Sequence, residues 1–150
     1  MSGARQVLLV EDDLDNARLI GSWLSTLGFA VRHAITGEAA LAECERDRPD
    51  VVVLDIGLPG IDGLEVLRRL RRAAGWEQLP VVVTSIVQPA GDEPELDHQV
   101  RSWLVKPFSA RQLQRAVALA LDPHGPSSAT DDTGGARPAR RVQDTGQGLA

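Results

Sequence analysis

Short apolar runs recur along this chain and alternate with segments whose apolar residues have helical spacing. The runs lie at residues 6–10, 29–34, 51–54, 80–85 and 102–106. The third run, VVVL, is apolar at every position, which is typical of a central strand covered on both faces of a sheet. Strands that alternate with helices pair in parallel, so the pattern predicts an α/β fold with a five-stranded, doubly wound parallel sheet.

Helix-end signals stand at the expected places between these runs. Gly28 follows the first helical pattern as a C-terminal glycine, Thr36 can cap the second helix, and Ser109 with Gln112 forms a capping box before the last. Residues 88–98, QPAGDEPELDH, carry two prolines and a glycine where the fourth helix belongs. We therefore expect an irregular or shortened fourth helix.

Composition limits the domain organisation and the cellular setting. Residues 123–150 contain Gly, Ser, Pro, Asp and Arg with almost no large apolar residue, which predicts one globular domain over 1–122 and a disordered C-terminal tail over 123–150. The net charge of −5 argues against direct DNA binding. A single cysteine excludes an internal disulfide, and no segment has the ~20 apolar residues that cross a membrane. We expect a cytoplasmic protein with no membrane association.

Polar residues follow four of the five predicted strands. In a flavodoxin-like sheet with strand order 2-1-3-4-5, the carboxyl ends of these four strands lie side by side, and ligands bind there. The second strand contributes no such group. The residues that follow the other four are Glu11, Asp12 and Asp13; Asp55; Thr84 and Ser85; and Lys106 with Pro107.

These residue types suit phosphoryl transfer. Several carboxylates in one pocket repel one another, which favours a divalent cation, and Mg²⁺ is commonly held by one or two carboxylates together with phosphate oxygens. Lys106 would stabilise phosphoryl charge, and Thr84 could donate a hydrogen bond to a phosphoryl oxygen. Asp55 then becomes a plausible covalent phosphoryl acceptor, since aspartate can act as a nucleophile.

Four motifs together resemble the receiver domain of bacterial two-component response regulators. They are LLVEDD (8–13), LDIGLPGIDGLEVLRRLR (54–71), VVVTS (81–85) and WLVKPF (103–108), and the resemblance covers about residues 5–121. It implies that a histidine kinase or histidine phosphotransfer protein donates a phosphoryl group from phosphohistidine to Asp55 in a Mg²⁺-dependent reaction.

The resemblance also implies individual roles at the metal site and at the switch. Asp12 would bind Mg²⁺ directly and Glu11 through water, with Asp55 and the Gly57 carbonyl as further ligands. Lys106, before a cis Pro107, would bind the phosphoryl group. Thr84 would be the switch hydroxyl and Trp103 the switch aromatic, and phosphorylation would draw the Thr84 loop inward because it adds charge and acceptor oxygens.

Some positions depart from the family pattern and keep a second function open. Ser85 stands where Ala is common, Gln99 and Val100 replace small residues, and Trp103 is bulkier than the usual Tyr or Phe. The alternative is a phosphorylation-independent scaffold with an altered switch face. A hydrolase of the haloacid-dehalogenase type would need a second acid where Gly57 stands.

We expect the protein to signal through a protein contact or phosphorelay, and we do not expect it to be an enzyme in the usual sense. No helix-turn-helix or catalytic domain is recognisable after residue 121, so we expect a single-domain regulator whose downstream protein target the sequence does not identify.

The remaining conspicuous residues receive structural roles. We expect Asp13 to cap the first helix, Cys44 to be a small core residue, and the RRLRR run at 68–72 to be mostly a solvated helix face. The three histidines are scattered without metal-ligand spacing and receive no functional role.

Overall fold

The computed structural model describes residues 3–73, 75–87, 100 and 102–122. Five strands form one sheet in the order β2-β1-β3-β4-β5, and every pair with a described register is parallel. This confirms the predicted fold class and strand order. The elements are β1 (Gln6–Val10), α1 (Leu14–Thr26), β2 (Ala30–Ala34), α2 (Gly37–Arg46), β3 (Val51–Asp55), α3 (Gly63–Arg72), β4 (Val81–Ser85), β5 (Ser102–Val105) and α5 (Ala110–Leu121).

Two predictions fall outside the described residues: the irregular fourth helix at 88–98 and the C-terminal tail at 123–150. Within the described part, no helix combines the length and the apolar character needed to cross a membrane.

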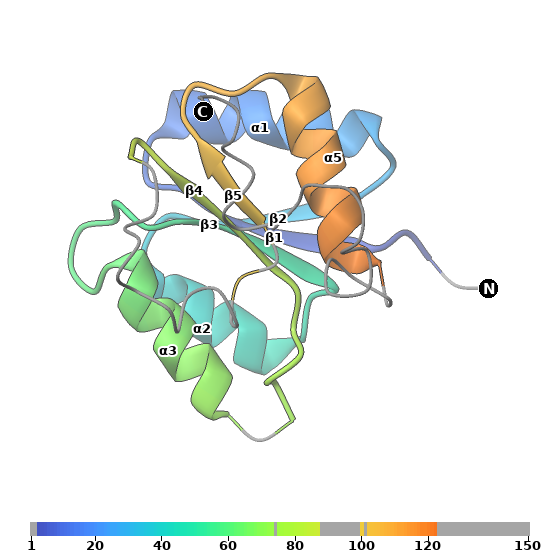
Figure 1. The fold of residues 1–150 in the computed structure, drawn as a ribbon. Coiled ribbons are helices and arrows are strands. Elements are labelled where there is room, and N and C mark those ends of the chain that lie inside the picture. Colours follow the sequence, from blue (N-terminus) through green and yellow to red (C-terminus); the bar gives the residue numbers. More distant parts are fainter. Residues whose placement is uncertain (1–2, 74, 88–99, 101, 123–150) are drawn as a thin grey trace, which may run out of the picture. The chain divides into compact units, whose positions relative to one another are not determined.

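The chain divides into two compact units, residues 1–79 and 80–150. In the first unit β1 lies between β2 and β3, with α1 on one face of the strands and α2 and α3 on the other (Figure 1). Strands β1 and β3 supply the centre of the core, since Val7–Val10 and Val51–Leu54 are at most 1% exposed. Such complete burial explains why these two runs are apolar at every position.

The helix ends of the first unit follow the predicted signals. The Asp13 carboxylate accepts a hydrogen bond from the Asn16 amide and caps α1, and Thr36 caps α2 in the same way. Gly28, after α1, has a φ of 100°, a conformation that favours glycine.

The arginine run of α3 is solvated only in part. Arg68 and Arg69 are exposed and pair with Glu65, as a solvated face would. Arg71 is half-buried instead, and its guanidinium donates hydrogen bonds to the carbonyls of Trp76 (3.1 Å) and Leu79 (2.7 Å). It therefore ties the end of α3 to the connection that leads into β4.

In the second unit β4 and β5 pair in parallel and α5 packs against them. The Ser102 hydroxyl donates a hydrogen bond to the Ala116 carbonyl (3.0 Å), which fixes α5 on β5. Leu113, Val117 and Ala120 form the buried side of α5. The predicted capping box is present between Ser109 and Gln112.

Cys44 is a core residue on α2, as predicted, with 1% of its surface exposed. Burial raises the pKa of its thiol to about 11, so roughly one molecule in a thousand carries the reactive thiolate at pH 8. We expect a disulfide reagent such as Ellman's reagent to react with the native protein at least tenfold more slowly than with protein unfolded in guanidinium. Equal rates in the two conditions would contradict the burial of this thiol.

Candidate functional site

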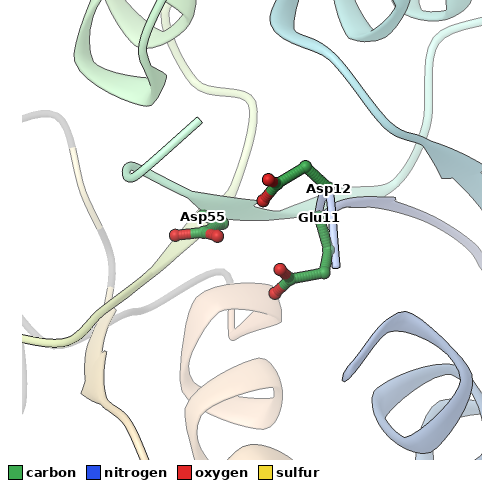
Figure 2. A group of neighbouring side chains, drawn as sticks. All are labelled: Glu11, Asp12 and Asp55. Carbon is green, nitrogen blue, oxygen red and sulfur yellow. The ribbon is translucent and has the colours of Figure 1, made fainter. Parts of the chain in front are cut away.

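Three carboxylates form an acidic cluster, defined here as Glu11, Asp12 and Asp55. Val10 pairs with Leu54 in the parallel register of β1 and β3, so the next residue of each strand, Glu11 and Asp55, lies at the same edge of the sheet. One oxygen from each carboxylate lies within 4.8 Å of the others. Figure 2 shows the Glu11 and Asp12 side chains extending toward the side chain of Asp55.

Local hydrogen bonds fix two of these carboxylates. Asp55 accepts a hydrogen bond from the Gly57 amide at 2.9 Å, which shapes the turn that leaves β3. Glu11 accepts one from the Asp13 amide at 3.2 Å. Glu11 and Asp55 are 2% and 6% exposed, whereas Asp12 is exposed. Two members of the cluster, Glu11 and Asp55, are therefore buried, and the third, Asp12, faces solvent.

The donor set fits a hard divalent cation. Buried carboxylates of like charge repel one another, and a divalent cation with oxygen ligands offsets that repulsion. Mg²⁺ takes one or two carboxylates and keeps other positions for water or phosphate oxygens. Because Asp12 is exposed, the cluster is open to solvent on its side, where water or phosphate oxygens can reach a bound ion.

The predicted hydroxyl and ammonium residues lie in the second unit. Thr84 is the last residue but one of β4 and is 1% exposed, and Lys106 follows β5 directly and is half-buried. The Lys106 amide donates a hydrogen bond to the Ser85 carbonyl at 2.7 Å. The two residues thus stand at the carboxyl ends of paired parallel strands. The predicted cis peptide between Lys106 and Pro107 is present.

Trp103 lies in the interior of the second unit, with 3% of its surface exposed. Its indole N–H donates a hydrogen bond to the Val87 carbonyl at 3.1 Å. The Val87 amide in turn donates to the Ser85 hydroxyl at 3.0 Å. The segment after Thr84 is therefore joined both to the end of β4 and to the indole ring.

Sequence reasoning missed a contact that β2 makes with the acidic cluster. His33, the last residue but one of β2, places its Nε2 atom 2.8 Å from the main-chain carbonyl oxygen of Glu11. A main-chain acceptor leaves no signature in residue type, and neither spacing nor composition could have identified this pair.

Comparison with known proteins gives one family. The model for the response regulator receiver domain matches residues 7–118. The KDP operon transcriptional regulatory protein KdpE of Escherichia coli is 36% identical over 126 residues, which are 83% of this chain and 55% of that protein. The transcriptional regulatory protein AfsQ1 of Streptomyces coelicolor is 35% identical over 77% of this chain and 50% of its own length. The chain spans about half the length of these relatives.

Solved structures agree with the family model. The chemotaxis response regulator CheY4 of Vibrio cholerae has a TM-score of 0.73 and 25% identity, covering 79% of this chain and 99% of that one. The receiver domain of the sensor histidine kinase PA1611 of Pseudomonas aeruginosa has a TM-score of 0.72 and 29% identity, covering 79% and 98%. That structure holds a magnesium ion in its active site cleft.

Proposed function

Because the chain belongs to the response regulator receiver domain family, we propose that it accepts a phosphoryl group on Asp55 in a magnesium-dependent reaction. The observation that carries the proposal is the acidic cluster, whose three carboxylates lie within 4.8 Å at the carboxyl ends of β1 and β3. An Asp55 oxygen attacks the phosphorus of a phosphohistidine. The new P–O bond replaces the P–N bond, and the histidine nitrogen leaves with the electron pair.

The acidic cluster supplies the metal ligands in this proposal. Asp12 and Asp55 bind Mg²⁺ directly, Glu11 acts through water, and the Gly57 carbonyl completes the protein's share. The hydrogen bond from the Gly57 amide to Asp55 supports this set, because it keeps both residues in one tight turn. Bound Mg²⁺ neutralises the charge of the transferring group.

Lys106 and Thr84 bind the phosphoryl group in the same proposal. Lys106 offers an ammonium to oxygens that the metal does not reach, and the Thr84 hydroxyl donates to one of them. Their positions at the carboxyl ends of β5 and β4 support these roles, since ligands of open parallel sheets bind at that edge.

The phosphoryl donor is a histidine kinase or a histidine phosphotransfer protein, and the output is a contact with a target protein or onward transfer of the phosphoryl group. Two relatives are named as transcriptional regulators, but this chain covers only about half of each. The proposal for this chain therefore includes no activity of the parts of those relatives that lie outside the matched region. A cytoplasmic location is part of this proposal, and the single cysteine is compatible with it because the chain has no internal disulfide to form.

Thr84 and Trp103 form the switch in this proposal. Phosphorylation adds acceptor oxygens that draw the Thr84 hydroxyl toward Asp55, and this movement pulls on the segment that runs to Val87. The indole hydrogen bond to the Val87 carbonyl supports the coupling, because a shift of that carbonyl changes the environment of the ring.

Beryllofluoride, which mimics an aspartyl phosphate, tests the acceptor site and the switch together. We expect Mg²⁺ and beryllofluoride to change the tryptophan fluorescence of the chain saturably, because Trp103 is bonded to the segment after Thr84. Trp103→Phe should remove most of that change while leaving beryllofluoride binding intact, and Trp23→Phe is the matched control that should retain it.

Other results would redirect the proposal. Binding without a fluorescence change would show that Trp103 is a fixed core residue, in keeping with its 3% exposure. Absence of Mg²⁺-dependent binding would exclude the phosphoacceptor function and favour a scaffold that works without phosphorylation.

A further inference from the structure

The main chain at the start of the acidic cluster is tied to β2 at both of its polar atoms. The Glu11 amide donates to the Ala34 carbonyl at 3.1 Å, which continues the strand ladder by one residue. The Glu11 carbonyl, which lies beyond that ladder, is 2.8 Å from the Nε2 atom of His33. Because a carbonyl oxygen only accepts, the hydrogen atom of this bond lies on Nε2.

The position of the Glu11 carbonyl affects the direction in which the Asp12 residue leaves the end of β1. The Glu11 carbonyl and the Asp12 amide belong to one planar peptide group, so fixing the oxygen fixes the plane from which the Asp12 residue departs. Asp12 is the exposed member of the acidic cluster and has little packing to orient its side chain. Figure 2 shows that side chain extending from the end of β1 toward Asp55.

The opposite side of the same turn is also restrained. The Asp13 amide donates to the Glu11 carboxylate, and the Asp13 carboxylate caps α1 through the Asn16 amide. The residues on both sides of Asp12 are thus held by hydrogen bonds. Two of these bonds are made with β2, one from the Glu11 amide to the Ala34 carbonyl and one from His33 to the Glu11 carbonyl.

We propose that His33 is a positioning residue, whose imidazole N–H holds the Glu11–Asp12 peptide so that Asp12 faces Asp55 and binds the metal ion. The role rests on the proposed function, because it concerns the geometry of the same Mg²⁺ site. His33 acts through the main chain and contacts neither the metal ion nor the phosphoryl group. In this proposal β2 contributes to the site through the main chain of Glu11, a role that the sequence does not indicate.

Calorimetric titration of the full chain with Mg²⁺ tests this role. His33→Leu removes the N–H donor and should weaken Mg²⁺ binding roughly fivefold, the loss expected from one hydrogen bond that no longer orients a ligand. His33→Gln places an amide N–H near the position of Nε2 and should restore affinity to within twofold of the unsubstituted chain. Thermal unfolding of each variant reports stability separately.

Ser22→Ala provides the matched control. The Ser22 hydroxyl also donates to a main-chain carbonyl, that of Leu19 at 2.8 Å, but lies within α1. Its loss should leave Mg²⁺ affinity unchanged, and an equal loss of affinity in this variant would overturn the specific role of His33. If His33→Leu does not fold, His33→Asn replaces it, since its amide is one methylene too short to reach the carbonyl.

The outcomes separate the two proposals. Unchanged affinity in His33→Leu, or failure of His33→Gln to restore a lost affinity, overturns the positioning role while the phosphoacceptor function stands. A chain with native histidine that binds no Mg²⁺ overturns the proposed function and the positioning role together. Beryllofluoride binding distinguishes this last case from a failure of the calorimetric signal.

Discussion

Replacing Asp55 with asparagine is expected to abolish phosphoryl incorporation from acetyl phosphate while the fold is kept. The amide has nearly the shape of the carboxylate and its oxygen can still accept the hydrogen bond of the Gly57 amide, so the turn after β3 survives. An amide oxygen is a poor nucleophile, and the variant lacks one of the three charges that favour Mg²⁺. Incorporation should fall below detection, at least 100-fold under that of the unsubstituted chain.

Intact-protein mass spectrometry measures this directly, since one bound phosphoryl group gives a single mass increment. Chelation of Mg²⁺ should reduce labelling of the unsubstituted chain to the same background. The matched control is Asp62→Asn, a change of the same chemistry at an exposed residue in the loop before α3. Asp62 caps α3 through the Glu65 amide, and asparagine caps equally well, so labelling should be normal.

Labelling of Asp55→Asn at the level of the unsubstituted chain would place the acceptor elsewhere and remove the basis of the proposed function. Loss of labelling in both variants would indicate damage to the loop between β3 and α3 rather than loss of the acceptor. The comparison of the two asparagine variants therefore separates chemistry from folding.

The acidic cluster was predictable from sequence because its members are adjacent to the ends of recognisable strands. An apolar run that ends in Asp55 fixes where the carboxylate leaves the sheet, and parallel register brings the end of β1 beside it. The same reasoning predicted the caps at Asp13 and Ser109, whose hydrogen bonds are local in sequence. Local signals of this kind depend on only a few neighbouring residues.

Contacts between a side chain and a distant main-chain group were not predictable. The run at 68–72 predicts a solvated helix face, yet Arg71 donates to the carbonyls of Trp76 and Leu79. Nearby, Arg48 stacks over the Trp76 ring at 5.4 Å and donates to the Gly75 carbonyl. His33 belongs to the same class. Any residue can offer a carbonyl, so the sequence of the acceptor carries no information about such a bond.

Gly63→Ala is expected to lower the free energy of unfolding by about 3 kcal/mol, at the upper end of ordinary overpacking. A Cβ atom at Gly63 would meet the backbone of Ile56, and would lie 2.6 Å from the Asp55 carbonyl oxygen. These are main-chain atoms that cannot rotate aside, so either the start of α3 or the end of β3 must move. For a chain of this length the midpoint of thermal unfolding should fall by roughly 10 °C.

Gly21→Ala is the matched control, because Gly21 lies inside α1 and its nearest neighbour for an added Cβ is a Val31 methyl at 4.0 Å. That substitution should stabilise the chain by about 0.5–1 kcal/mol, the usual gain of alanine over glycine within a helix. Unchanged stability in Gly63→Ala would show that α3 can lift from β3 without cost, contrary to the close contact at its first residue.

The same glycine links the packing of α3 to the acceptor. The Gly63 amide donates a hydrogen bond to the Ile56 carbonyl at 3.2 Å. Because Ile56 directly follows Asp55, this bond joins the first residue of α3 to the backbone next to the acceptor. In Gly63→Ala that remains folded at low temperature, phosphoryl incorporation should slow more than tenfold, because displacement of the Asp55 carbonyl also turns its side chain from the other two carboxylates. Normal incorporation in a destabilised variant would instead mean that α3 moves and β3 keeps Asp55 in place.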